Sequence, residues 1–350
     1  MTALWRTRGK RAAISSGLAA ISFLASAGIM RDACGCGAIF TLHHVRPKTP
    51  RIFAPNAHLE ITPEYLDLAI RQLKKIGYDF IPLDAVPERL RGRNRPLFAA
   101  FTLDDGNRNN AEHALPVFES HGVPFTVFVT RGFTERTHSM WWETLAELLN
   151  RLDAFSFDFG SGPERLDLGS PAQKHAAFDR FAAYILTAGE AQHVAAVDAA
   201  ARQQAIDPLF ITEQLTMTAD ELRRLAAHPL ASLGAHTLSH RALALIGENE
   251  AAEEMAASAA FVETITGKRP RTIAYPYGTV STVSKREARL AKELGFAIGV
   301  TTQPGILTAD HIAEATYLPR ISLNGLYQNR HSVTALASGI PFRLMRKTPA

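Results

Sequence analysis

The strongest constraint on the fold is a buried strand that ends in two adjacent carboxylates. The run from Pro96 to Leu103 is apolar enough for a strand of a parallel sheet with both faces covered. Asp104, Asp105 and Gly106 follow at once, and the glycine permits a sharp turn. Adjacent side chains of an extended backbone point in different directions, so the two carboxylates cannot have the same role. Adjacent like charges also hinder each other's ionisation unless a cation or a shared proton intervenes. The pair fits either a metal ligand beside a free proton acceptor, or an Asp that caps the next helix.

Strand and helix patterns alternate along most of the chain, with links of a few residues. This alternation is typical of a parallel α/β sheet or barrel. Roughly seven or eight strands are enough to close a (β/α) barrel. The expected strands are 37–42, 78–82, 96–103, 125–130, 232–235, 272–275, 296–301 and 317–321. The fold class is therefore α/β, with a barrel of about seven parallel strands.

The alternation stops between about 141 and 230, where we expect a helical insertion inside a domain of residues 34–330. Trp141 and Trp142 begin a helix that runs to about Leu152. Residues 172–207 are rich in Ala, Gln and Glu, which favours further helices. The two tryptophans either form an aromatic wall at the mouth of the barrel, where they could stack against a bound substrate, or anchor the insertion.

Basic residues gather at the two ends of the chain. Residues 1–33 carry a net charge of +4 and residues 315–350 carry +5, so the residues between them carry −5 of the total of +4. A nucleic-acid binder would instead carry its charge as a patch on the folded domain, so no nucleic-acid partner is expected. The basic ends fit loose contact with an anionic membrane surface, or solvated segments. Residues 331–350 are predicted to form a basic tail.

Residues 1–33 are predicted to form a basic amphipathic helix. Residues 12–28 have the outline of a signal peptide, but serines break the apolar run, which is too short and too polar to span a bilayer. A retained helix is therefore favoured over a cleaved signal. The expected location is the cytoplasm, with membrane association or an envelope location as alternatives. The apolar stripe of this helix is expected at Leu18, Ile21, Phe23 and Leu24.

Polar residues follow several of the predicted strands. His43 follows the first, His236 follows the strand that ends at Ala235, and Tyr277 follows the strand 272–275. Arg320 lies inside the last strand. In a parallel barrel these strand ends share the face where active sites are built.

His236 and His240 are four residues apart, which predicts one helical turn with both rings able to reach a single ion. The alternative is a pair of surface histidines. Two histidines and one carboxylate leave positions for water and substrate, as in hydrolytic metal sites.

Three motifs, in this order, resemble those of the polysaccharide deacetylases, the NodB-homology or carbohydrate esterase 4 family that includes chitooligosaccharide deacetylases. Residues 102–110 resemble the family's TFDDG motif, residues 234–240 its histidine motif, and residues 274–278 its third motif. The likeness runs from about Gly37 to Ile321. It implies a deformed (β/α) barrel with one divalent metal ion, usually zinc, with cobalt, nickel or manganese as alternatives.

The resemblance also implies a reaction and the residues that perform it. The reaction is hydrolysis of N-acetyl groups from amino sugars in an oligo- or polysaccharide. Asp105, His236 and His240 would bind the metal, and Asp104 would act as the general base toward water. Pro276 and Tyr277 would line the substrate pocket, with the Tyr277 N–H aimed at the oxyanion.

Two positions depart from the family's pattern. Many members carry an arginine two residues before the proline of the third motif, where this chain has Ala274. Arg320 is the nearest substitute that could orient the base. The family's C-terminal histidine acid has no clear counterpart. His43 resembles the histidine after the first strand of exopolysaccharide deacetylases, which is placed to act as the acid, and His44 is the alternative.

Two other functions stay open. The two departures leave open a barrel that binds carbohydrate without turning it over. The basic N-terminal helix leaves open a deacetylase or deformylase of a lipid-linked sugar. Which acetylated glycan is bound depends on loops, so the sequence motifs do not choose among them.

Overall fold

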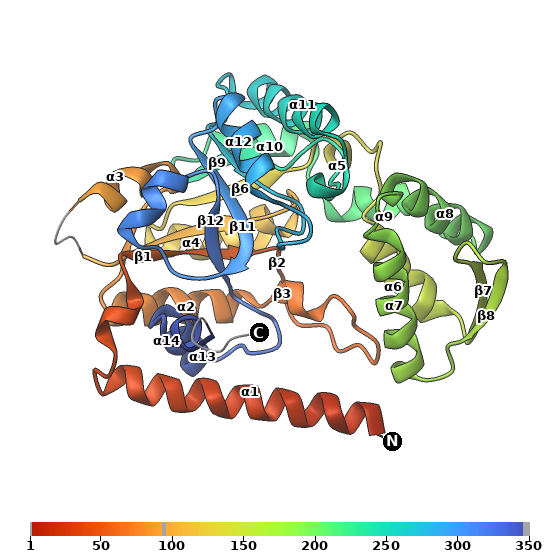
Figure 1. Cartoon of the computed structure of the whole chain (residues 1–350), viewed down its shortest axis with the longest axis horizontal. Coiled ribbons are helices and arrows are strands. Elements are labelled where there is room, and N and C mark those ends of the chain that lie inside the picture. Colours follow the sequence, from red (N-terminus) through yellow and green to blue (C-terminus); the bar gives the residue numbers. More distant parts are fainter. Residues whose placement is uncertain (1, 93–95, 346–350) are drawn as a thin grey trace.

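Parallel strands close into a barrel at the centre of the molecule (Figure 1). The computed structural model describes residues 2–92 and 96–345, and within these ranges seven strands form the closed ring. The ring closes where β5 pairs with β1 over six residues, from Gly37↔Phe98 to Leu42↔Leu103. In ring order the strands are β1 (Gly37–Leu42), β12 (Leu318–Ser322), β11 (Ile298–Pro304), β10 (Thr272–Ala274), β9 (Ala231–Ala235), β6 (Phe125–Val129) and β5 (Phe98–Leu103). The predicted barrel is confirmed.

The predicted strand 78–82 is only two residues long and is not part of the ring. This strand, β4 (Asp79–Phe80), pairs with Phe98 and Ala99 at the beginning of β5. Because β1 pairs with the whole of β5, β4 shares the opposite edge with β6, which pairs with residues 101–103. β4 and β6 thus share one edge of β5, and β4 pairs only with the first two residues of that strand.

Helices surround the barrel, and capping residues set their beginnings. Thr62 accepts a hydrogen bond from Tyr65 N, and Pro63 occupies the first turn, as the sequence predicts. Thr218 and Glu221 form the predicted capping box. The surrounding helices are α2 (Pro63–Lys75), α3 (Val86–Arg91), α4 (Leu115–His121, preceded by the π-helical η4, Asn110–Ala114), α10 (Ala219–Ala226), α11 (Glu248–Thr266) and α12 (Lys285–Glu293).

Two apolar clusters explain why the strands are apolar on both faces. Alternate strand residues point into the barrel, and one cluster includes Ile39, Ala100, Phe128 and Val300. The strand residues between them, such as Phe101, pack with residues of α2, α4 and α10 in the other cluster. The barrel is therefore a filled core, and only its mouth is available for a site.

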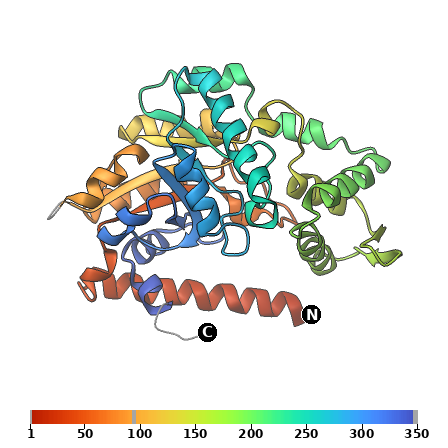
Figure 2. The same ribbon diagram turned by 45° about the horizontal axis from the view of Figure 1, so that its top comes forward.

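The chain between β6 and β9 forms a lobe beside the barrel (Figures 1 and 2). This insertion has its own core, to which Leu148, Phe181 and Val197 belong. Its elements are α5 (Arg131–Thr134), α6 (Trp141–Arg151), the antiparallel hairpin β7 (Ala154–Asp158) and β8 (Pro163–Asp167), α7 (Pro171–Ile185), α8 (Glu190–Gln203) and α9 (Pro208–Leu215). The exact domain limits stay a prediction.

Helices from the two ends of the chain lie together beneath the barrel (Figure 1). They are α1 (Thr2–Ser26), α13 (Arg330–Ala337) and α14 (Ile340–Met345). The segment predicted as a tail thus continues in two short helices, because buried residues such as Val333 and Phe342 join the core. Residues 346–350 lie outside the described residues.

The predicted apolar stripe of α1 is only half right. Leu18 and Ile21 are partly buried, together with Ser22, which is 4% exposed. Phe23 is 73% exposed, because two residues after Ile21 the helix has turned by about 200°. Among the described residues, no helix is both long and apolar enough to cross a membrane.

Gly234 in β9 gives a test of barrel packing. A Cβ at this position would lie 2.5 Å from Cδ1 of Phe128 and 2.6 Å from Oγ1 of Thr272. Gly234→Ala should therefore lower the free energy of unfolding by about 1–3 kcal/mol, measured by urea denaturation. Gly17→Ala in α1 is the control, because nothing lies within 4 Å of the added methyl and Ala is the better helix former. Equal stability of Gly234→Ala and the wild type would contradict this packing.

Candidate active site

The carboxyl ends of the barrel strands surround a cavity of about 390 Å³. Asp104 and Asp105 reach it from the end of β5, and His236 reaches it from the end of β9. Other candidates from the barrel that line the cavity are His43, His240 and Tyr277. The structure thus brings together most of the residues that the sequence predicts for one site.

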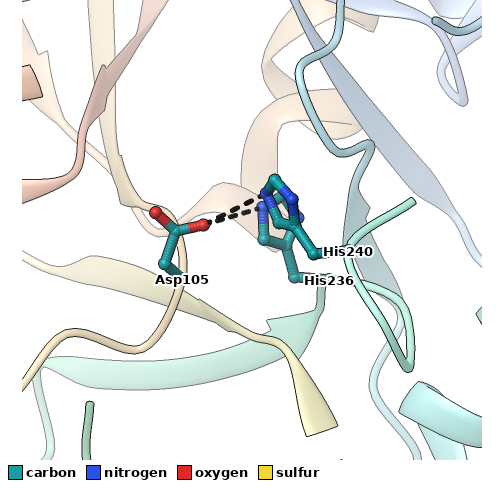
Figure 3. Close-up of side chains that lie close together, drawn as sticks. All are labelled: Asp105, His236 and His240. Carbon is teal, nitrogen blue, oxygen red and sulfur yellow. Dashed lines mark ion pairs between the residues drawn. The ribbon is translucent and has the colours of Figure 1, made fainter. Parts of the chain in front are cut away.

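Asp105, His236 and His240 point at one another inside the barrel mouth (Figure 3). Nε2 of each histidine lies 3.4 Å from Oδ1 of Asp105, and all three atoms lie within 4.8 Å of one another. All three residues are buried, and within the described chain Oδ1 of Asp105 has no hydrogen-bond partner. A tetrahedral ion with bonds of about 2.0–2.2 Å holds its ligand atoms roughly 3.4 Å apart. The three side chains therefore fit a metal ion such as zinc.

The surroundings of Asp105 and His236 favour the binding of a cation. Burial alone would raise the pKa of Asp105, but His236 and His240 outweigh it and hold that pKa well below its ordinary value. Nδ1 of His236 lies 2.7 Å from the carbonyl oxygen of Ala274, a contact that orients the ring so that Nε2 faces Asp105.

The helical turn predicted for residues 236–240 is wrong: the segment is a loop. Thr237 and His240 have φ angles of 62° and 61°, in the left-handed region. Glu254 of α11 holds this loop, because Oε2 accepts hydrogen bonds from Leu238 N (2.9 Å) and Ser239 N (2.8 Å). The two rings converge through this turn. The sequence carried no local signal for Glu254, which comes from the next helix.

Asp104 is held by Arg320, as expected from the departure at Ala274. Nη1 of Arg320 donates to Oδ1 (2.7 Å) and Nη2 donates to Oδ2 (2.6 Å). The arginine is 1% exposed and is itself fixed by Thr102 Oγ1 and Thr301 O. Burial raises the pKa of Asp104, but the Arg320 guanidinium lowers it by a larger amount. The pKa of Asp104 therefore lies below its ordinary value. Asp104 is thus kept ionised and oriented at neutral pH.

The two adjacent histidines occupy different surroundings. His43 is partly exposed to the cavity, with Nε2 3.9 Å from Oδ2 of Asp104. His44 is 1% exposed, and Nδ1 lies 2.9 Å from Nδ2 of Asn109. Burial lowers the pKa of His44 to about 3, so it is neutral. The geometry favours His43 over His44 as the residue that can reach a substrate.

The aromatic residues form one side of the cavity. Trp141 and Trp142 are 6% and 7% exposed and belong to the core of the insertion, which favours the anchoring role for both. The ring of Trp142 is nevertheless 4.8 Å from that of His240, and both tryptophans line the cavity. Pro276 is buried and is not among the lining residues.

A second hollow adjoins the first at Asn56. It has a volume of about 580 Å³ and lies between residues 46–56 and the helices α6 and α9. Asn56 lines both hollows and donates from Nδ2 to Oε1 of Glu143 (2.9 Å). Burial raises the pKa of Glu143 to about 7. No motif in the sequence pointed to this carboxyl.

One family model matches the chain, and a relative with a name from the same family matches part of it. The family model for polysaccharide deacetylase matches residues 91–161 and 191–299. A Bacillus subtilis (strain 168) protein named "Putative polysaccharide deacetylase YxkH" is 26% identical over 106 residues. That match covers 30% of this chain and 37% of the YxkH protein.

Two solved structures share the fold. The Streptococcus pyogenes deacetylase PplD, in complex with acetate, has a TM-score of 0.54 at 18% identity, over 83% of this chain and 92% of PplD. IcaB from Ammonifex degensii has a TM-score of 0.55 at 17% identity, over 87% of this chain and 98% of IcaB.

The Arg320–Asp104 pair predicts a large effect on stability. Arg320→Met should lower the free energy of unfolding of the metal-free protein by about 3–5 kcal/mol, because the buried carboxylate loses its partner. The double variant Arg320→Met/Asp104→Asn removes both charges and should recover part of the loss. Urea denaturation with a chelator present measures both effects. A single variant as stable as the wild type would show that the pair does not form.

Glu143 predicts a stability that depends on pH. Its folded pKa of about 7 lies above the ordinary 4.5, so between these values the folded state binds a proton that the unfolded state has lost. Stability therefore falls as pH rises through this window. Glu143→Gln cannot ionise, so it should gain stability relative to the wild type between pH 5 and pH 8. Denaturation midpoints at both pH values measure this difference, and an unchanged difference would contradict the raised pKa.

Proposed function

The chain belongs to the polysaccharide deacetylase family, and from this premise we propose that it is a metal-dependent hydrolase of N-acetyl groups on amino sugars. The observation that carries the proposal is the buried Asp105–His236–His240 group beside Asp104, which Arg320 holds ionised. The Arg320 contact supports catalysis over binding alone, because it supplies the orienting arginine that Ala274 cannot.

The three ligands proposed for the ion are Asp105, His236 and His240, and zinc suits two imidazoles and a carboxylate. When bound, a divalent ion supplies Lewis-acid chemistry, which acidifies water and polarises a carbonyl group. Cobalt, nickel or manganese are the alternatives to zinc.

The remaining chemistry is assigned to residues of the chain. Asp104 accepts a proton from the water that adds to the acetyl carbon. The Tyr277 backbone N–H donates to the oxygen that becomes negative. When the C–N bond breaks, Nε2 of His43 gives a proton to the leaving amine, and acetate and a free amino sugar result. Burial lowers the pKa of His43, which makes its protonated form a stronger acid but a less populated one at neutral pH.

An extended glycan is proposed as the substrate. The second hollow continues from the catalytic cavity at Asn56, and Phe210 at its edge is 57% exposed. An exposed aromatic face can stack against a sugar ring. The two adjoining hollows support an oligo- or polysaccharide over a single sugar. Membrane contact and the cellular location stay predictions, which fractionation would test.

Acetate release tests the proposed function. N-acetylglucosamine oligomers of increasing length, incubated with the protein and zinc or cobalt, should release acetate, and a chelator should abolish the release. Asp104→Asn should lower the rate by about 10²–10⁴-fold because it removes the general base. It should leave metal binding intact, since the three ligands are unchanged.

Asp84→Asn, at an exposed aspartate outside the cavity, is the matched control and should keep the wild-type rate. Near-normal release by Asp104→Asn would refute the assignment of the base. A wild type that binds the oligomers but releases no acetate would identify a carbohydrate-binding barrel instead.

A further inference from the structure

His240 differs from the other two proposed ligands in how it is held. Nδ1 of His236 has a carbonyl partner, whereas Nδ1 of His240 has no hydrogen-bond partner among residues 2–92 and 96–345. Aromatic rings surround it instead, with centroids 4.8 Å away for Trp142, 4.9 Å for Tyr277 and 5.5 Å for Phe133. The orientation of His240 therefore depends on how firmly these rings are fixed.

The ring of Tyr277 is fixed from the insertion. Its Oη accepts a hydrogen bond from Nε1 of Trp141 (2.8 Å) and donates to Oε1 of Glu190 (2.8 Å). Glu190 is the first residue of α8 and is 2% exposed. The hydrogen bonds that position the Tyr277 ring thus run from Trp141 through the phenol to the buried carboxylate of Glu190.

The same carboxylate also holds the backbone that follows His240. Oε2 of Glu190 accepts a hydrogen bond from Ala242 N (2.7 Å), two residues after the ligand. Glu190 therefore acts on His240 from two sides, through the loop after β9 and through the ring that follows β10. His240 has a left-handed φ of 61°, a conformation that persists only where the surroundings enforce it.

We propose that Glu190 is a positioning residue for the metal ligand His240, so that the helical insertion completes the metal centre of the barrel. This rests on the proposed function only in taking His240 as a metal ligand. Glu190 touches neither the ion site nor the catalytic cavity directly, since it lines the hollow on the far side of Trp142 and His240. Its effect is therefore expected first in metal affinity, and in the rate only as a consequence.

Cobalt binding to the full chain tests the proposal. Titration with Co²⁺, followed by its visible absorption, gives a dissociation constant and a spectrum that reports the ligand geometry. Glu190→Ala should weaken Co²⁺ binding by about 10–100-fold and alter the spectrum, as expected when the groups that orient a ligand lose their support. Glu190→Gln keeps one acceptor oxygen and should give a smaller loss. Tyr277→Phe keeps the ring but loses its link to Glu190, and should also weaken binding.

Asp198→Asn is the matched control. Asp198 is another buried acid of α8 and lines the same hollow as Glu190, but it accepts its hydrogen bond from Ser139 Oγ (2.9 Å) instead of from Tyr277. This variant should bind Co²⁺ as the wild type does. If it weakened binding as much as Glu190→Ala, a general loosening of α8 would be the cause and the proposal would be wrong.

The remaining outcomes are decisive as well. Wild-type affinity and spectrum in Glu190→Ala would overturn the proposal. If Glu190→Ala fails to fold, Glu190→Gln and Tyr277→Phe decide in its place, and wild-type binding by both would overturn it. A wild-type chain that binds no Co²⁺ also overturns it. A chain that binds Co²⁺ but releases no acetate contradicts the proposed deacetylation while leaving the role of Glu190 standing.

Discussion

Two adjacent carboxylates are buried at the end of one barrel strand, and the site is organised around compensating their charge. Asp104 and Asp105 are 2% and 3% exposed, and burying an unpaired charge costs several kcal/mol. Arg320 compensates Asp104 through two short hydrogen bonds. Asp105 has only two imidazoles at 3.4 Å, which is a donor set for a cation. Arg320 therefore keeps Asp104 ionised, whereas Asp105 and the two histidines form a group that fits a cation.

Backbone strain gathers at the same place. Among the described residues, seven residues other than glycine have positive φ, and four of these lie at the site: Asp105, Thr237, His240 and Tyr277. Each such residue costs on the order of 1–3 kcal/mol and persists only where its surroundings enforce it. In the loop that carries Thr237 and His240, buried acids of two helices hold the backbone, Glu254 from α11 and Glu190 from α8. The strain explains how side chains from separate loops can converge on one point.

The insertion is part of the site, although it is a separate lobe with its own core. Trp142 contacts His240, and Trp141 and Glu190 hold the hydroxyl group of Tyr277. The second hollow also lies between this lobe and residues 46–56. Variation in such an insertion can change the substrate while the barrel keeps its chemistry, since loops at a barrel mouth carry specificity.

The sequence by itself determined the barrel and the carboxylates and paired histidines that meet at its mouth. Alternating strand and helix patterns are local, and polar residues at strand ends can be read without knowing the strand order. The contact of Arg320 with Asp104 was expected, but these residues are 216 positions apart, so only barrel closure decided it. Only the tertiary structure showed that His43 faces the cavity while His44 is buried. It also showed that residues 236–240 form a loop, not a helical turn, and that Glu190 and Glu254 hold that loop. These features depend on long-range contacts and on left-handed backbone at residues other than glycine, which leave no local pattern in the sequence.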